Sequence, residues 1–427
     1  MFFAKEGFGR TLTAALASGT ALVGASAAWA DTTLTVWSWD PSFNGDIMQR
    51  AMARYQANHP DVDLEVADFG KAALEQKLQS QLASGSTQGL PDIVLIEDYA
   101  AQRFLLTFPD AFEPVGEHID LSGMAPYKTA LSTVDGVTYS MPFDSGVAGL
   151  FYRSADLEEA GLDASALEDI TWAEFVEIAG RVEAATGKDF IVQPYNATDL
   201  VRLMLHSAGI WYTTPEFEVT AEVDPRFRQV VESYVNVMQS GVVADAAGWT
   251  EYISAFTSHD VSGVATGAWI TAAIKGNPDQ SGEWSVAPVP RVEGVETAVH
   301  ASNVGGSSWY VLTDAPNKEE ALNFLDEVWA GDADFYAEIL VEKGAVGSLL
   351  AAQDTDAYGQ PDAFFGGQPI WNDFATWLQD VPEVNFGVFT AEAEASFLAY
   401  IPDVIRGNAH LDEALATYTL RLKQQIQ

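Results

Sequence analysis

The segment Pro91–Asp98, PDIVLIED, decides the class of fold. Its central residues, Ile93 to Ile96, are all apolar, whereas the residues of a strand with one face in water alternate between apolar and polar. An unbroken apolar run of this length is typical of a strand covered on both faces, as in a parallel sheet flanked by helices. The run ends abruptly at Glu97 and Asp98. The segment therefore predicts an interior strand of an α/β domain.

The residues before this strand predict more elements of the same kind. Residues 33–38 alternate like a first strand, residues 47–55 carry one apolar helical face, and Val62–Val66 predicts a second strand. Leucines then recur every four residues from Leu74 to Leu82, which predicts a helix followed by a loop from Gly85 to Pro91. The resulting order, in which strands and helices alternate, predicts an α/β lobe.

The rest of the chain continues the mixture of strands and helices. Residues 135–153 predict a turn, a short strand, a proline and a second strand, and Thr171 with Glu174 has the spacing of a capping box that starts a helix. The chain has 427 residues, more than one hydrophobic core usually supports. We therefore expect an α/β fold with two lobes.

The N-terminus has the pattern of an export signal. Lys5 and Arg10 precede an apolar stretch, Thr11–Ala25, and Ala28–Ala30 matches an A-x-A cleavage site. This pattern predicts a cleaved signal peptide at residues 1–30. The apolar stretch is too short for a spanning helix, and no later run is longer, so we expect a soluble, exported mature chain. Because the sequence has no cysteine, we expect no lipid anchor, and hence a free periplasmic protein.

Composition excludes several classes of function. The chain has 61 acidic and 21 basic residues, a formal net charge of −40. Removal of Lys5, Arg10 and Glu6 with the signal peptide, two basic residues and one acidic, takes the charge to −41. Such a chain is repelled by nucleic acid and anionic lipid, and an anionic ligand would need a local cluster of arginines. The acidic excess also suggests a saline habitat.

Sequence motifs of catalysis and metal binding are absent. The six histidines are scattered without an HExxH pair, and no GxSxG, GxGxxG or GxxxxGK[ST] motif occurs. A segment resembling a calcium loop, DTDAYG, has Tyr358 and Phe365 where ligands are required. Adjacent carboxylates such as Glu97 and Asp98 are expected by chance in so acidic a chain. We therefore expect no enzyme activity, no metal and no cofactor.

Aromatic and acidic residues meet at the ends of two predicted strands. Trp39 and Asp40 end the first strand, and Glu97 and Asp98 end the apolar one. Because ligands of parallel sheets lie outside the carboxyl ends of the strands, these residues should neighbour one cleft. An aromatic face covers the C–H face of a sugar ring, and carboxylates accept hydrogen bonds from its hydroxyl groups. The pattern therefore indicates a neutral, hydroxyl-rich ligand.

A set of segments in a fixed order resembles the family-1 extracellular solute-binding proteins of sugar ABC importers, which include maltose- and lactose-binding proteins. The segments are TVWSWDPSFN, LPDIVLIEDYAAQ, YSMPFDSGVAGLFYR, GVATGAWI, WSVAPVPRVEG, NVGGSSWYVLTDAPNKEEALNFL and AFFGGQPIWNDF. The stretches EDYAAQ and FFGGQPIW are most similar to lactose- or arabinoside-type binders. The loop after Pro41 lacks the lysine of maltose binders, and Ile96 replaces their aromatic residue, so maltose is not the expected ligand.

The resemblance implies two α/β lobes that close around a ligand by hinge motion. It implies hinges at Tyr139–Asp144 and Val286–Val292 and a third crossing near Gly344–Ser348. The N-lobe would then comprise residues 31–140 and 293–345, and the C-lobe residues 141–292 and 346–427.

The resemblance also implies a set of ligand-binding positions on both lobes. They are Trp37, Trp39, Asp40, Glu97, Asp98, Asp144, Tyr195, Trp269, Gly305, Gly306, Trp309 and Trp371.

Several of these positions have a structural alternative. Trp37 lies within its strand, which favours the core over the site, whereas Asp98 could equally cap the helix that follows it. Asp144 could pair with a neighbouring arginine, and Gly305 with Gly306 could only permit a turn. Three further tryptophans fit the core or the site equally well; they are Trp211, Trp249 and Trp377.

We expect a periplasmic protein, active as a monomer, that binds a neutral mono- or oligosaccharide and delivers it to an ABC permease. One alternative is the same fold with a polyol, a glycerol phosphoester or a polyamine as ligand. A phosphoester would require a cleft arginine or lysine, and a polyamine would require cleft carboxylates. The other alternative is a secreted carbohydrate-active enzyme with a carboxylate pair at hydrolytic spacing.

Overall fold

A computed structural model describes residues 32–426. The predicted signal peptide, residues 1–30, lies outside the described residues. Within 32–426, none of the helices is both long and apolar enough to cross a bilayer.

The backbone of the fold is one mixed sheet with the strand order β2-β1-β3-β11-β6-β9-β7-β8, to which β10 is added by pairing with β6. Its strands are β1 (Thr32–Ser38), β2 (Val62–Asp68), β3 (Ile93–Glu97), β6 (Met141–Arg153), β7 (Ile191–Val192), β8 (Val243–Ala244), β9 (Gly263–Gly267), β10 (Trp284–Ala287) and β11 (Asn303–Val311). A separate hairpin joins β4 (Thr133–Val134) to β5 (Val137–Thr138).

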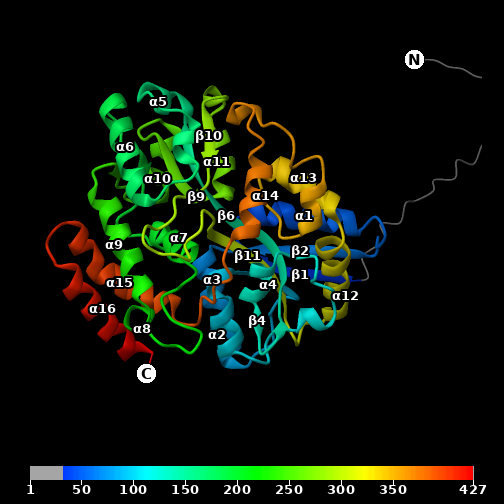
Figure 1. Ribbon diagram of the computed structural model, residues 1–427. Coiled ribbons are helices and arrows are strands. Elements are labelled where there is room, and N and C mark those ends of the chain that lie inside the picture. Colours follow the sequence, from blue (N-terminus) through cyan, green and yellow to red (C-terminus); the bar gives the residue numbers. More distant parts are fainter. Residues whose placement is uncertain (1–31, 427) are drawn as a thin grey trace, which may run out of the picture.

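Helices lie around this sheet in two groups (Figure 1). The first group comprises α1 (Asp46–Tyr55), α2 (Lys71–Ser84), α3 (Asp98–Thr107), α4 (Pro126–Leu131), α12 (Lys318–Phe324) and α13 (Ala333–Lys343). The second comprises α5 (Ser154–Glu159), α6 (Trp172–Thr186), α7 (Asp199–Ser207), α8 (Thr220–Val223), α9 (Pro225–Gln239), α10 (Trp249–Thr257), α11 (Thr271–Lys275), α15 (Thr390–Ile405) and α16 (Leu411–Gln425). Helix α14 (Ile370–Asp380) lies between the two groups, beside α13 (Figure 1).

The predicted α/β class is confirmed. Strand β1 pairs in parallel with both β2 and β3, and Ile93–Ile96 of β3 are completely buried, as their unbroken apolar run predicts. Thr171 and Glu174 form the expected capping box at the start of α6: Thr171 Oγ1 accepts from Glu174 N at 3.2 Å, and Glu174 Oε2 accepts from Thr171 N at 2.8 Å. Helix α6 then ends at Gly187, whose φ of 73° is the left-handed cap that glycine adopts without strain.

Strand β6 belongs to both lobes, and all of its residues are buried. Its first part pairs with β11, from Met141 opposite Trp309 to Val147 opposite Asn303. From Ala148 onward it pairs instead with β9, and its end pairs with β10. The pairing partner of β6 thus changes near residues 145–148, just after the expected hinge at Tyr139–Asp144, and we propose that the chain crosses between the lobes there.

The predicted lobe bounds stay a prediction, and hydrogen bonds of residues 288–302 bear on them. Arg291 N donates to Ile170 O, and Val299 N donates to Ser207 O, each at 3.0 Å. Both acceptors belong to the predicted C-lobe. Arg291 lies within that predicted lobe, but Val299 belongs to residues 293–345, which are predicted for the N-lobe. We therefore propose that the second crossing lies at residues 302–306, later than the expected Val286–Val292.

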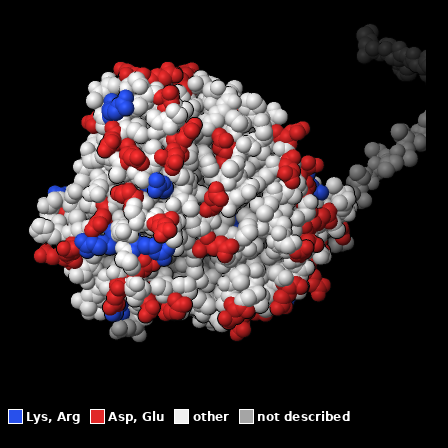
Figure 2. Space-filling model, in the orientation of Figure 1, with Lys and Arg blue, Asp and Glu red and all other residues white. Residues whose placement is uncertain are grey.

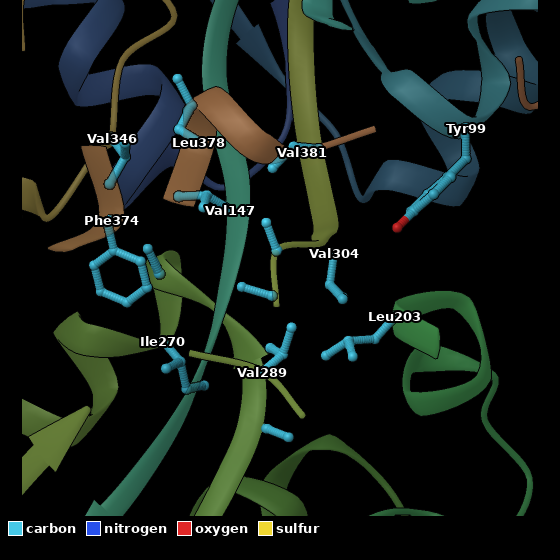
Figure 3. Close-up of a cluster of buried hydrophobic side chains, with 14 of the residues drawn as sticks. Tyr99, Val147, Leu203, Ile270, Val289, Val304, Val346, Phe374, Leu378 and Val381 are labelled. Atoms are coloured by element: carbon cyan, nitrogen blue, oxygen red, sulfur yellow. The ribbon is translucent and has the colours of Figure 1, made fainter. Parts of the chain in front are cut away.

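The third crossing segment, Gly344–Ser348, runs beside the first part of β6. Ser145 N donates to Val346 O at 2.7 Å, and Ser348 N donates to Phe143 O at 3.0 Å. Apolar side chains pack around the three crossing segments, with Val147, Val304 and Val346 coming from one segment each (Figure 3). The crossing region is thus part of the hydrophobic core.

Candidate functional site

A cavity of about 670 Å³ opens between the two lobes where β6 and β11 cross. Predicted site residues meet there from both lobes and from the crossing strands; they are Trp39, Asp40, Glu97, Asp144, Trp269, Gly305 and Gly306. Residues that the sequence reasoning did not single out as site residues also line it, among them Phe43, Asn44, Lys71, Tyr99, Asp199, Arg202, Trp249, Ile270, Ser307, Glu342 and Lys343. We refer to this cavity as the cleft.

The turn after β1 places Trp39 and Asp40 at the cleft. Asp40 has a φ of 54°, and its Oδ1 accepts hydrogen bonds from Ser42 N at 3.2 Å and Phe43 N at 3.1 Å. It thereby caps the π-helical turn Pro41–Gly45. One carboxylate oxygen of Asp40 is thus committed to the turn, and the half-buried Trp39 indole presents an apolar surface beside it.

Two indoles of the C-lobe line the opposite wall. Trp269 Nε1 donates to Val304 O at 2.9 Å, which fixes the ring against β11. The Trp249 ring is tilted by 31° to it at a centroid distance of 5.7 Å, and Trp249 is 62% exposed. Large exposed aromatic surfaces of this kind mark binding sites. Trp249, which fits the core or the site equally well by sequence, therefore lies on the cleft.

The floor of the cleft is a bulge in β11 formed by Gly305 and Gly306. Their φ values are 90° and 92°, a region that residues with a side chain rarely adopt. A Cβ atom on Gly305 would lie 3.3 Å from Trp269 Nε1, and one on Gly306 would lie 2.7 Å from Asp98 Oδ2. These glycines do more than permit a turn, because they leave room for the indole on one side and a buried carboxylate on the other.

Asp144 is the acidic group at this floor. Its Oδ1 accepts hydrogen bonds from Ser307 N at 2.8 Å and Ser307 Oγ at 2.6 Å. Burial raises the pKa of Asp144, and the neighbouring Lys128 opposes that rise. The alternative that Asp144 pairs with an arginine is wrong, since its partner is a serine.

The cations that line the cleft are all paired with carboxylates. Lys71 Nζ lies 2.8 Å from Glu97 Oε2, and Lys343 Nζ lies 2.8 Å from Asp46 Oδ2. Arg202 forms a bidentate salt bridge with Glu394. Among the residues lining the cleft, no lysine or arginine is therefore left to neutralise an anionic ligand.

Tyr99 connects the lobes beside the cleft. Its ring stacks on Trp211 of the C-lobe at 5.5 Å and 9°, and Arg202 Cζ lies 4.4 Å from the ring centroid. Its hydroxyl group accepts from Gly305 N at 3.2 Å, so the ring points toward the crossing strands (Figure 3). Tyr99 directly follows Glu97 and Asp98 at the end of a strand, and this position could have identified it as a site residue from the sequence. Trp211 is core, because it is buried and its Nε1 donates to Thr390 Oγ1.

Two predicted site residues lie in the core instead. Trp309 is completely buried, because Phe143 and Trp329 cover its ring at centroid distances of 5.5 and 5.8 Å. Trp37 packs edge-on against Phe69, in agreement with the core alternative for this residue. Neither side chain is among those that line the cleft.

Three other predicted site residues also lie outside the lining of the cleft. Asp98 is 1% exposed and pairs with Lys128 Nζ at 2.5 Å, and the cap of α3 is Glu97 instead. Trp371 is buried beneath Gly344, where a Cβ atom would lie 3.3 Å from its ring. Tyr195 is half-buried, and its N–H donates to Asp245 Oδ1 at 2.9 Å.

Comparison with known proteins agrees with this architecture. Residues 50–366 match the bacterial extracellular solute-binding protein family. The chain is 44% identical to a lactose-binding protein of Rhizobium radiobacter over 98% of both chains, and 23% identical to an arabinooligosaccharide-binding protein of Halalkalibacterium halodurans over 86% of this chain and 84% of that one. The sugar-binding protein MalE of Xanthomonas citri superposes with a TM-score of 0.77 at 18% identity, covering 92% of this chain and 97% of that one. The chain belongs to the bacterial extracellular solute-binding protein family.

Proposed function

We propose that this protein binds a neutral sugar, a mono- or oligosaccharide related to lactose or arabinosides, as the substrate-binding component of an ABC transporter. The observation that carries the proposal is a cleft with indoles on opposite walls, Trp39 and Trp269, above an acidic acceptor, Asp144. The indole faces suit the C–H faces of sugar rings, and the carboxylate suits their hydroxyl groups. The 44% identity to a lactose-binding protein over nearly the whole chain supports the same ligand class.

The mechanism is closure of two lobes around the ligand. Trp39 and Glu97 come from one lobe and Trp249 and Trp269 from the other, so a ligand that touches both favours the closed arrangement by its differential affinity. The proposal includes no bond cleavage, a periplasmic location after removal of residues 1–30, delivery to a membrane permease, and action as a monomer.

The alternative ligands differ in charge. A glycerol phosphoester is disfavoured, because the cleft cations Lys71, Arg202 and Lys343 already have carboxylate partners. A polyamine is the second candidate, since Asp144 and Asp199 line the cleft and have no ion-pair partner among residues 32–426. The two candidates make opposite predictions in one experiment.

The experiment is a thermal-shift screen of the purified mature protein, followed by calorimetric titration. Lactose, arabinooligosaccharides, polyols, glycerol phosphate and polyamines are tested separately. A ligand at 100 times its Kd stabilises the native state by about 2.7 kcal/mol, so we expect an increase in Tm with a sugar. An increase with polyamines alone would contradict the proposal. Disappearance of the sugar during incubation with the protein alone would indicate an enzyme instead.

A further inference from the structure

A buried ion pair lies directly behind the floor of the cleft. Lys128 of α4 is completely buried, and its Nζ donates to Asp98 Oδ2 at 2.5 Å. The same ammonium group donates to Ser307 O of β11 at 2.9 Å. Neither Lys128 nor Asp98 lines the cleft. A buried lysine is costly unless its charge is paired and hydrogen-bonded, and these two contacts meet both conditions.

Ser307 links the ion pair to the acidic group of the cleft. Its carbonyl accepts from Lys128, while its N–H and hydroxyl group both donate to Asp144 Oδ1. The other carboxylate oxygen, Asp144 Oδ2, has no hydrogen-bond partner among residues 32–426, although Asp144 lines the cleft. One oxygen is therefore fixed by the protein, and the other is left for a ligand.

The charges of this cluster do not balance. Asp98 and Asp144 are two buried carboxylates, and Lys128 is the cation that opposes the loss of charge on both. Burial raises the pKa of Asp98 to about 6 and raises the pKa of Asp144, while Lys128 lowers both. The titratable groups that face these two carboxylates come from four elements; they are Glu97 of β3, Tyr127 and Lys128 of α4, Tyr310 of β11 and Tyr336 of α13.

Gly306 makes this arrangement possible. A Cβ atom there would lie 2.7 Å from Asp98 Oδ2, closer than a carboxylate oxygen tolerates. The backbone of Ser307 thus lies between Lys128 and Asp144, and Asp98 occupies the space that a side chain at Gly306 would need.

We propose that Lys128, balanced by Asp98, is a positioning residue that keeps Asp144 ionised and holds its Oδ2 toward the ligand. This inference rests on the proposed function, because it assigns a role to a group behind the same cleft. It makes ligand affinity depend on pH through a side chain that no ligand touches.

The test measures the Kd of lactose between about pH 5 and pH 8 for the wild type, Lys128→Met and Asp98→Asn. The wild type is expected to bind more weakly as the pH falls and Asp144 takes up a proton, at a limit of about tenfold per pH unit. Lys128→Met removes the cation, so the midpoint of this loss should move to higher pH. Asp98→Asn removes a like charge, so the midpoint should move to lower pH.

The opposite directions of the two midpoint shifts distinguish a positioning role of Lys128 from a purely structural one. A Lys128→Met variant that weakens binding by the same factor at every pH would overturn the proposal. If this variant fails to fold, Asp98→Asn decides alone, and a midpoint that stays or rises contradicts the proposal. Lys318→Met is the matched control, because Lys318 also pairs with a carboxylate, Glu113, at 3.0 Å and does not line the cleft; we expect no change of Kd or midpoint.

A measurement without ligand separates this inference from the proposed function. Aspartate labelled with ¹³C at its side-chain carboxyl carbon reports the titration of Asp144 in the free protein, and the signal is assigned by its loss in Asp144→Asn. We expect the same two opposite shifts of the midpoint in Lys128→Met and Asp98→Asn. If these shifts occur and no sugar binds, the proposed function is wrong and the charge-holding role stands. Unshifted midpoints overturn the inference whatever the ligand is.

Discussion

Individual tryptophans occupy opposite environments in this chain. Trp249 is 62% exposed at the cleft, whereas Trp309, three residues after the bulge of β11, is completely buried against Phe143 and Trp329. Burial determines what each indole contributes: a buried one stabilises the fold, and an exposed one beside a cavity is available to a ligand.

Alanine substitutions should separate these two contributions. Trp309→Ala leaves a cavity in a packed aromatic cluster and is expected to lower the free energy of unfolding by about 3–5 kcal/mol. Trp249→Ala should change this free energy by less than about 1 kcal/mol, because its ring is already in water. It should nevertheless weaken sugar binding about three- to tenfold through the loss of one aromatic contact. Urea denaturation and calorimetric titration measure the two effects. Equal losses of stability would contradict the assignment.

Sequence reasoning located some site residues and not others for a physical reason. Trp39 and Glu97 end strands, and strand ends face the ligand edge of a parallel sheet, so local pattern sufficed. Trp309 is kept from the cleft by Phe143 and Trp329, which come from distant parts of the chain and pack over its ring. Lys128 has no local signal, because its partners Asp98 and Ser307 are brought to it by the tertiary fold.

The bulge of β11 is the element on which the cleft depends. Gly306→Ala forces a φ of 92° on a residue with a side chain and places its Cβ atom 2.7 Å from Asp98 Oδ2. Backbone strain of this kind costs about 1–3 kcal/mol, and the displaced carboxylate adds to that cost. We expect a lower urea midpoint and weaker ligand binding.

Gly359→Ala is the matched control for this substitution. No atom lies within 4 Å of a Cβ atom at Gly359, and its φ is not in the left-handed region. Its urea midpoint should stay within experimental error of the wild type or rise slightly. If Gly306→Ala unfolds at the same urea concentration as Gly359→Ala, the bulge does not require glycine.

The order of strands and helices along the chain can be predicted from the sequence. The residues at which the chain crosses between the lobes are harder to predict. The parallel β1 and β3 follow from alternation and from an apolar run. Residues 288–302 carry prolines and no periodicity, so their attachment is decided by single hydrogen bonds and by His300, whose Nδ1 lies 3.0 Å from Val289 O and whose Nε2 lies 2.9 Å from Asp169 Oδ1. A sequence pattern does not reveal contacts of this kind between distant residues.

The whole molecule carries far more negative than positive charge. With 61 acidic and 21 basic residues, about 40 carboxylates remain even if every cation is paired. Acidic side chains are spread over the face seen in Figure 2, with few basic ones between them. Mutual repulsion of these charges destabilises the compact state.

Salt should therefore stabilise the protein. The Debye length falls from about 10 Å at 0.1 M to about 3 Å at 1 M, so added salt screens repulsion between carboxylates across the surface. We expect the Tm at neutral pH to rise by several degrees between about 0.05 M and 1 M sodium chloride. Chloride is preferred to sulfate, since sulfate also stabilises proteins by exclusion from their surface. A constant or falling Tm would mean that the ion pairs outweigh the repulsion.

The position of β11 in the sheet governs when the first lobe can form during synthesis. Strands β1, β2 and β3 are complete after about a quarter of the chain, but β3 has β11 as its neighbour, and β11 begins only at Asn303. At about 5–20 residues per second, a ribosome reaches that strand roughly 15–60 s after it starts. Until then the central strand of the lobe has an open edge and a missing partner. The sheet of this lobe therefore cannot be completed before β11 has been synthesised.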